Sequence, residues 1–331
     1  MEDTLVFSCL SGYNLYVPAQ DGVTDTVHFF SRDPVDIRYS KYIHTADIAR
    51  KWKHFVEHPV DIQRFLWPTD IVGCDEDDAY GLVFPRRAFP KMEKLKKLLY
   101  SPDTLGLQNP LVKKVIRHFL LAFSNLHACG YAYHAFDLEK MYYNEGTGEV
   151  LLDFSSAMSL CDRGTPELLG AAVEEVGIEF LPPWRRLSAD EAFYLEDDRY
   201  SIATVLFRLI TGRMPYQGRF MDGYGDMMVA QRDVDPDMHI QMFRHYHENP
   251  VFIFDREDRR NSIGTVSSEE RVIDRWEALP PTIRGMFETV YSRENLARTP
   301  EENRMLSGKR RLFTADQWLD ALACENLMDG D

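Results

Sequence analysis

Apolar and polar positions alternate over short stretches in the first part of the chain. The segments TLVFSCL, NLYVP, TVHFF and IRYSKYI lie between residues 4 and 43, with turn-forming residues such as Gly12, Gly22 and Pro34 between them. An amphipathic stretch follows at residues 46–56, and two more strand patterns lie at residues 70–72 and 79–85. We therefore expect a small antiparallel sheet accompanied by one helix.

From residue 109 onward the apolar spacing becomes helical. Residues 109–130 repeat with the 3.6-residue period, opened by Asn109 and Pro110 and closed by Gly130. Residues 200–212 are apolar nearly all round, which is typical of a helix in the centre of a domain. Between these two helices, MYYN and EVLLDF are joined by EGTG and predict a hairpin. Later helices are expected at Trp276, in TIRGMFETVY and in TADQWLDAL. The order predicts an α+β fold with a small sheet before a larger helical part.

Composition limits the class of partner. The 331 residues are 44% hydrophobic, and 53 acidic against 38 basic residues give a net charge of -15. This charge repels a polyphosphate backbone and disfavours nucleic acid as a partner. The compact basic run PKMEKLKK, ending at Lys97, is expected to be the solvated face of a helix.

Cysteine usage and hydropathy indicate the compartment. The five cysteines are scattered and form no CxxC pair, which suits a reducing cytosol. The N-terminal segment carries acid where a signal peptide carries positive charge, and no apolar run approaches the roughly 20 residues that span a bilayer. We expect a cytoplasmic protein without a membrane partner.

Three motifs in this order resemble those of protein kinases, and the resemblance covers nearly the whole chain. LHACGYAYHAFDLEKMYY stands where kinases have LHxxGIxHRDLKPxNIL, DFS resembles the DFG turn, and DRYSIATVLFRLITGRMPY resembles DxWSxGxxLxxLLTGxxPF. HYHENPVFIFDRED, and LWPTDIV before the hinge, resemble the eukaryotic-like Ser/Thr kinases of bacteria. The resemblance implies a bilobal protein-kinase-like fold, with a small antiparallel β N-lobe at 1–86 and a larger, mainly helical C-lobe at 87–331.

The resemblance assigns the nucleotide contacts to the N-lobe. Lys41 matches the lysine that contacts the α and β phosphates of ATP. Of the phosphate-covering GxGxxG loop, only Gly12 survives in LSGYNLYV, which argues against a tight phosphate cradle. Val83 and Phe84 are the other nucleotide-binding positions that the resemblance implies.

The resemblance also implies a magnesium site. Asp153 of DFS matches the aspartate that binds Mg²⁺, a hard cation that prefers carboxylate oxygen, although Ser155 replaces the usual glycine.

In the family a glutamate on the helix after the lysine strand pairs with the lysine matched by Lys41. The candidates for it here are Glu57 and Asp47, and neither is well placed.

The catalytic loop departs from the family at its chemical positions. Counted without gaps, the family's histidine, arginine, catalytic aspartate and second magnesium-ligand asparagine are replaced by Tyr133, His134, Ala135 and Lys140. Ala135 cannot accept a proton, and an ammonium group at Lys140 competes with a metal cation. Loss of a general base costs about 10² to 10⁴ in rate. A shifted loop that brings Asp137 inward would supply another carboxylate.

Other positions are expected to be structural. Asp198 matches the aspartate that braces the catalytic-loop backbone by accepting from amide donors. Trp184 stands where the family has a glutamate that pairs with an arginine, and Leu312 falls close to the arginine's place, next to Arg310 and Arg311. If both partners are apolar, packing has replaced that ion pair. The sequence gives no metal-ligand spacing to His239, His245 and His247.

These residues leave three hypotheses open. The first is a pseudokinase with impaired phosphotransfer, which binds ATP and Mg²⁺ weakly and acts on other proteins as a signalling scaffold or regulator. The second is an atypical active Ser/Thr kinase that uses Asp137 and Asp153. The third is a binding module whose cleft is filled by side chains and takes no nucleotide.

Overall fold

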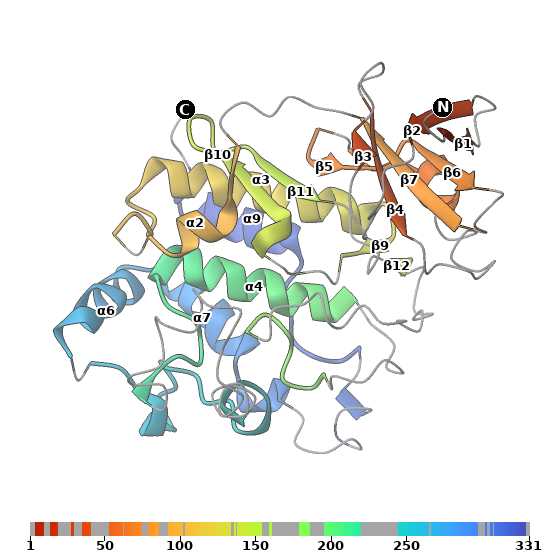
Figure 1. Cartoon of the computed structure of the whole chain (residues 1–331). Coiled ribbons are helices and arrows are strands. Elements are labelled where there is room, and N and C mark those ends of the chain that lie inside the picture. Colours follow the sequence, from red (N-terminus) through yellow and green to blue (C-terminus); the bar gives the residue numbers. More distant parts are fainter. Residues whose placement is uncertain are drawn as a thin grey trace. The chain divides into compact units, whose positions relative to one another are not determined.

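The computed structural model describes a large part of the 331-residue chain (Figure 1). The described residues are 4–9, 14–18, 28–29, 35–40, 53–61, 63–74, 79–85, 92–101, 103–133, 136, 138–153, 159–160, 179–185, 195–219, 244–264, 266–296, 302, 305–306 and 308–328. The chain divides into two compact units, residues 1–91 with 151–154 and residues 92–150 with 155–331. The kinase lobes expected at 1–86 and 87–331 stay a prediction.

Six strands of the first unit form one sheet with the order β2-β1-β6-β7-β4-β3. Their bounds are β1 (Thr4–Cys9), β2 (Asn14–Pro18), β3 (His28–Phe29), β4 (Val35–Ser40), β6 (Asp70–Cys74) and β7 (Ala79–Pro85). All neighbouring strands in this order pair antiparallel. The strands expected from the alternating pattern are therefore confirmed, and the turn residues of the sequence fall between them.

The first unit has a small aromatic core that includes Phe55, Phe65 and Trp67. β5 (Phe65–Leu66) pairs in parallel with β11 (Val150–Asp153), so that Leu152 lies opposite Phe65. The ring of Trp67 lies edge-on to those of Phe55 and Phe65, at centroid distances of 5.7 and 6.1 Å, and its Nε1 donates to the Phe55 carbonyl over 2.8 Å. Phe55, from the expected amphipathic helix, is fully buried. The indole thus joins that segment to the strands.

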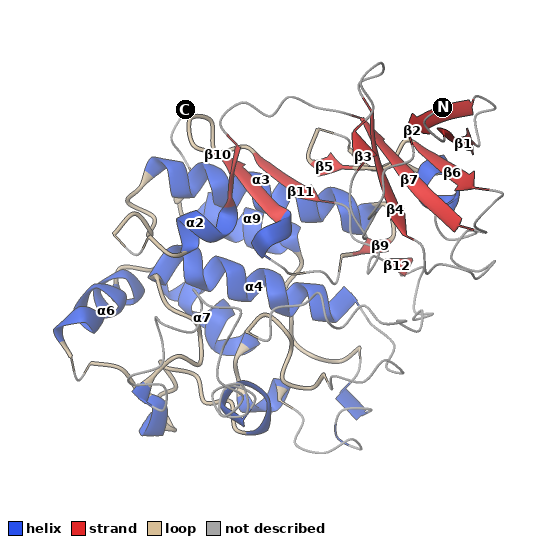
Figure 2. Cartoon of the chain, viewed as in Figure 1, coloured by secondary structure: helices blue, strands red, loops and turns tan. Residues whose placement is uncertain are grey.

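The second unit holds most of the helices, which Figure 2 shows in blue. Its strands are β8 (Met92–Lys94), β9 (Tyr131–Ala132), β10 (Met141–Asn144) and β12 (Ser159–Leu160). Its α-helices are α2 (Leu95–Leu99), α3 (Pro110–Ala128), α4 (Leu195–Thr211), α6 (Glu270–Glu277), α7 (Pro281–Val290) and α9 (Ala315–Cys324). Shorter helical turns are η1 (Leu138–Lys140), η4 (Arg244–Glu248), η5 (Arg259–Asn261), η6 (Ser267–Glu269) and η7 (Arg293–Asn295). The chain is therefore α+β, with a mostly helical C-terminal half.

Helix α3 forms where its sequence signals place it. The side chain of Asn109 accepts from the Leu111 amide over 3.0 Å, and Pro110 occupies the first turn, where its missing N–H costs nothing. One face of the helix is buried from Val112 to Leu126. Gly130 follows the C-cap with φ of 81°, a conformation that glycine adopts without strain. The expected helix is confirmed.

Helix α4 is the central helix of the second unit. It begins at Leu195, five residues before the expected start at residue 200, and is buried along nearly its whole length. It packs against α3, α6 and α7, and α9 packs against α3 (Figure 1). Gly212, with φ of 89°, follows its last residue. The nearly unbroken apolar pattern of the sequence reflects this position among other helices.

The basic run ending at Lys97 does not form one helix. Met92–Lys94 is a strand that pairs antiparallel with β10, and only Leu95–Leu99 is helical. Lys97 is exposed as expected, and it bridges Glu93 and Glu145 at 3.3 and 3.1 Å. Leu95, Leu98 and Leu99 are buried, so the segment is anchored by its apolar residues. In the described part of the chain, no helix is both long and apolar enough to cross a membrane.

Candidate functional site

Three consecutive carboxylates open helix α4 and all point into the interior of the second unit. Glu196, Asp197 and Asp198 are 7%, 2% and 0% exposed. The first turn of a helix favours negative charge, because its amide dipoles point toward it. A buried carboxylate still requires hydrogen-bond donors, since transfer from water without them is costly. Each of the three finds donors on a different part of the chain.

Asp198 fastens the segment that follows β9. Its Oδ2 accepts a hydrogen bond from the backbone amide of Tyr133 over 2.6 Å. The same oxygen lies 3.0 Å from Nε2 of His127, near the C-terminal end of α3. One carboxylate thus joins α3, the end of β9 and α4. Asp198 thus accepts from a backbone amide, and its role as the brace of a kinase catalytic loop stays a prediction.

The side chain of Tyr133 belongs to an aromatic cluster rather than to an open site. Tyr133 and Phe136 are 0% and 1% exposed. The Tyr133 ring lies edge-on to Phe123 and Phe136 at 5.6 and 5.8 Å, and Phe123 stacks on Phe136 at 5.1 Å. Such aromatic pairs stabilise a core by more than the burial of their surface area alone would. The position that the resemblance gives to a catalytic-loop histidine is therefore filled by packing.

Asp197 is held by two residues of the segment 179–185. Nε1 of Trp184 donates to its Oδ1 over 2.8 Å, and Nε of Arg185 donates to its Oδ2 over 2.9 Å. Nη2 of Arg185 bonds the same oxygen. Arg185 is itself 5% exposed. The charge of the carboxylate is therefore balanced inside the protein, and the segment ending at Arg185 is tied to the start of α4.

Glu196 forms a buried ion pair with Arg310, 114 residues away along the chain. Nη1 of Arg310 lies 2.6 Å from Oε1 of Glu196, and the amide of Gly308 donates to Oε2 over 3.0 Å. The Arg310 guanidinium also lies over the Trp184 ring, 4.2 Å from its centroid. Burial raises the pKa of Glu196 above its ordinary value and lowers that of Arg310. Desolvation therefore offsets part of the attraction between the two charges.

One conditional expectation concerns the end of the segment 179–185. If Trp184 and Leu312 occupied the places of both partners, packing would replace the ion pair, and Arg310 and Arg311 lie next to Leu312 in the sequence. An arginine does lie there, because Arg310 stacks on the Trp184 ring, and its carboxylate partner is Glu196 of α4. The ion pair is present with a different acid, and the indole supports it by a cation–π contact.

The other predicted site residues of the described segments belong to other elements. In the first unit, Asp153 ends β11, is 9% exposed and lies opposite Leu66 of β5. Val83 and Phe84 lie in β7, opposite residues of β4. In the second unit, Lys140 ends η1 and is half-buried. Five predicted residues lie outside the described segments: Gly12, Lys41, His134, Ala135 and Asp137. Among the predicted residues, the described structure joins Tyr133 and Asp198.

The residues assigned to magnesium fit that ion poorly. Mg²⁺ takes oxygen ligands from one or two carboxylates and from phosphates. Asp153 supplies one carboxylate, whereas the second ligand position carries the ammonium of Lys140. The described residues contain no group of three or more His, Cys, Asp or Glu side chains able to hold a metal. Of the three histidines considered, His247 is buried, His245 lies in η4 and His239 lies outside the described segments.

Sequence reasoning missed the roles of Asp197, Arg185 and Arg310. A usable signal was present, since three consecutive acids at the start of an apolar helix predict three sets of donors. The identity of those donors depends on tertiary contacts that no spacing shows. No protein-family model matches the chain, and a search of the curated proteins finds no match either.

Proposed function

We propose that this protein is a pseudokinase: a bacterial protein of the protein-kinase fold that acts through contacts with other proteins and has lost efficient phosphotransfer. The supporting observation is the bond from the Tyr133 amide to Asp198. The resemblance assigned bracing of the catalytic loop to that aspartate, and the amide it binds belongs to the first changed position of the loop. The brace persists where the chemical groups do not.

The chemistry of the changed positions argues against an efficient enzyme. Phosphoryl transfer depends on a carboxylate that orients the nucleophile and on metal ions that neutralise the phosphates. Ala135 offers no acceptor, and Lys140 brings a cation to a metal-ligand position. Tyr133 is buried among aromatic rings. A rate loss of about 10² to 10⁴ follows from the missing base alone.

One observation keeps an active enzyme as a second candidate. Asp153 ends β11 opposite Leu66 of β5, so strand pairing sets its backbone position, and the residue is 9% exposed. An atypical Ser/Thr kinase would use Asp153 for Mg²⁺ and Asp137 as the acid that orients the substrate hydroxyl. Both candidates imply that ATP binds.

Nucleotide binding is tested by thermal unfolding with ATP and MgCl₂. A ligand at 100 times its Kd stabilises the folded state by about 2.7 kcal/mol. We expect a smaller shift, because few groups remain to hold the phosphates, and we expect Asp153→Asn to reduce it. No shift at millimolar ATP would favour a binding module that takes no nucleotide.

Phosphotransfer is tested with γ-labelled ATP, on the chain itself and on a generic protein substrate. We expect no transfer by the natural chain and measurable transfer by Ala135→Asp with Lys140→Asn, which restores both family groups. Transfer by the natural chain that Asp137→Ala abolishes and Lys140→Ala retains would overturn the pseudokinase proposal.

A further inference from the structure

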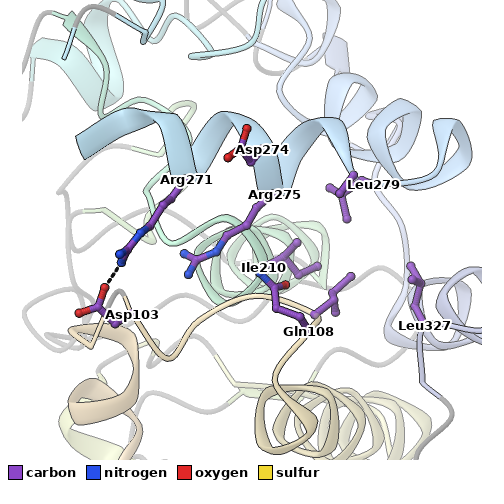
Figure 3. Close-up of a pocket in the computed structure, with 10 residues that line it drawn as sticks. Asp103, Gln108, Ile210, Arg271, Asp274, Arg275, Leu279 and Leu327 are labelled. Atoms are coloured by element: carbon purple, nitrogen blue, oxygen red, sulfur yellow. Dashed lines mark hydrogen bonds and ion pairs between the residues drawn. The ribbon is translucent and has the colours of Figure 1, made fainter. Parts of the chain in front are cut away.

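A pocket of about 820 Å³ lies in the second unit, at the C-terminal end of α4 (Figure 3). Its walls come from residues 103–108, the end of α4, helix α6 and Leu327, which follows α9. Pockets of 300–1,000 Å³ are typical of small-molecule sites, which combine apolar walls with a few polar groups that converge. Ile210 of the motif DRYSIATVLFRLITGRMPY lines this pocket, whereas none of the lining residues is a predicted nucleotide, magnesium or catalytic-loop residue.

The guanidinium of Arg275, a residue of α6, lies against the backbone at one side of the pocket. Its Nη1 donates to the Thr211 carbonyl over 3.3 Å. A Cβ at Gly212 would lie 2.6 Å from Nη1, and a Cβ at Gly106 would lie 3.0 Å from Nε. Both glycines have positive φ, at 89° and 109°. Two residues without side chains thus make room for the guanidinium, which places a fixed cation at the pocket.

Two aspartates, Asp103 and Asp274, and two arginines, Arg271 and Arg275, line the pocket. Arg271, one helical turn before Arg275, pairs with Asp103 and is 69% exposed. Burial lowers the pKa of Arg275, and repulsion by Arg271 lowers it further, more than Asp103 raises it. Asp274 also lines the pocket, but its carboxylate projects away from Arg275 in Figure 3. An anion bound beside Arg275 would relieve this repulsion.

The opposite side of the pocket is apolar. Ile210 and Leu279 are 1% and 4% exposed and form a firm wall. Leu107 and Leu327 are half-buried, so part of each side chain is available to a ligand. Figure 3 shows Leu279 and Leu327 on one side of the pocket and the two arginines on the other. The walls therefore match a molecule with one charged end and one apolar end.

We propose that this pocket binds a small organic anion with an apolar body, whose carboxylate, sulfonate or phosphate bonds the guanidinium of Arg275. Charged hydrogen bonds to arginine supply orientation and the leucine walls supply apolar contact. Because the net charge of the chain is -15, attraction of an anion to this pocket has to come from the nearby arginines rather than from the protein as a whole. The proposal is independent of phosphotransfer and of nucleotide binding.

The test is a fluorescence titration of the full chain with anilinonaphthalene sulfonate, which has one sulfonate and an apolar aromatic body. We expect saturable binding at one site and a rise in Kd of about tenfold for Arg275→Gln. The matched control is Arg256→Gln, whose arginine is 74% exposed and pairs with Glu288 elsewhere. Decanoate should displace the probe, whereas decanol should displace it far less.

A second variant keeps the test decisive if Arg275→Gln does not fold. Leu327→Glu places a carboxylate on the half-buried apolar side and should also raise the Kd about tenfold, while Leu306→Glu, at a half-buried leucine outside the pocket, should not. The proposal is overturned if the natural chain shows no saturable binding. It is equally overturned if Kd stays within twofold of the natural value in each pocket variant that folds, or if decanol competes as well as decanoate.

Discussion

The two ends of helix α4 hold charged groups in contrasting ways. The side chains of Glu196, Asp197 and Asp198 in its first turn are buried. Each of these carboxylates accepts hydrogen bonds from two residues of other segments. Just beyond the last turn of α4, Arg275 lies on two glycines beside an open pocket. Acids with complete sets of donors are part of the architecture. A cation held by backbone beside a cavity is positioned for a ligand.

We expect the first turn of α4 to contribute mainly to stability and the pocket beyond its last turn to contribute mainly to binding. Removing the partner of a first-turn carboxylate leaves a buried charge unpaired. We therefore expect the largest loss in the free energy of unfolding there. Changing the exposed charges near the last turn should leave stability almost unchanged and alter binding instead. Unfolding measurements on variants of each end test this contrast.

The largest effect is expected for Arg310→Met. The substitution leaves Glu196 buried without its cation, and breaking a buried ion pair in this way costs about 3 to 5 kcal/mol. Urea denaturation at neutral pH measures the loss. Arg311→Met is the matched control, because that neighbouring side chain is exposed and should cost little. Equal losses of stability in both variants would show that the ion pair between Glu196 and Arg310 does not cause the effect.

The pH dependence of the Arg310→Met deficit gives a second measurement on the same variant. The folded pKa of Glu196 already lies above its ordinary value of 4.5 because of burial, and removal of Arg310 raises it further. Glu196 therefore ionises in the unfolded chain at lower pH than in the folded chain, and stability falls as pH rises from about 4.5 through the folded pKa. The deficit should be larger at pH 7 than at pH 5, and adding Glu196→Gln should reduce this difference.

An intermediate effect is expected for Asp198→Ala. The Tyr133 amide loses its acceptor inside the protein, which costs about 1 to 3 kcal/mol. Asp198→Asn retains an oxygen at the same place and should recover part of this loss. Thermal and urea unfolding of the pair measure the difference. If alanine and asparagine behave alike, the bond to Tyr133 contributes nothing to stability.

The smallest effect on stability is expected for Arg271→Gln. Its ion pair with Asp103 joins two side chains that are 69% and 80% exposed, and such pairs contribute about 0 to 1 kcal/mol. The melting temperature should therefore barely change. A loss of stability comparable to that of Arg310→Met would show that the pocket is a structural element, contrary to the contrast between the two ends of α4.

Local patterns predicted the elements that depend on nearby residues. Asn109, Pro110 and Gly130 bound α3 as expected, because capping and positive φ are local properties. The start of α4 was placed five residues late, because LEDDR reads as a polar loop when its buried partners are unknown. The pattern of apolar positions cannot predict that a carboxylate is buried, because its burial depends on donors from distant segments.

The candidate site was predictable only in part. An amide donor for Asp198 could be predicted from its place in a motif, and the Tyr133 amide is such a donor. The pairing of Glu196 with Arg310 could not be predicted, since 114 residues separate them. The seat of Arg275 on Gly106 and Gly212 likewise depends on three segments meeting, which no single segment of the sequence encodes.

The bond between the Tyr133 amide and Asp198 also provides a natural reporter of local motion. An amide hydrogen that is buried and bonded exchanges with solvent deuterium only when its surroundings open. The exchange rate of this one hydrogen therefore measures how often the connection between α3 and α4 comes apart in the native protein. A partner that binds near the loop and slows that exchange would reveal itself without any enzymatic assay.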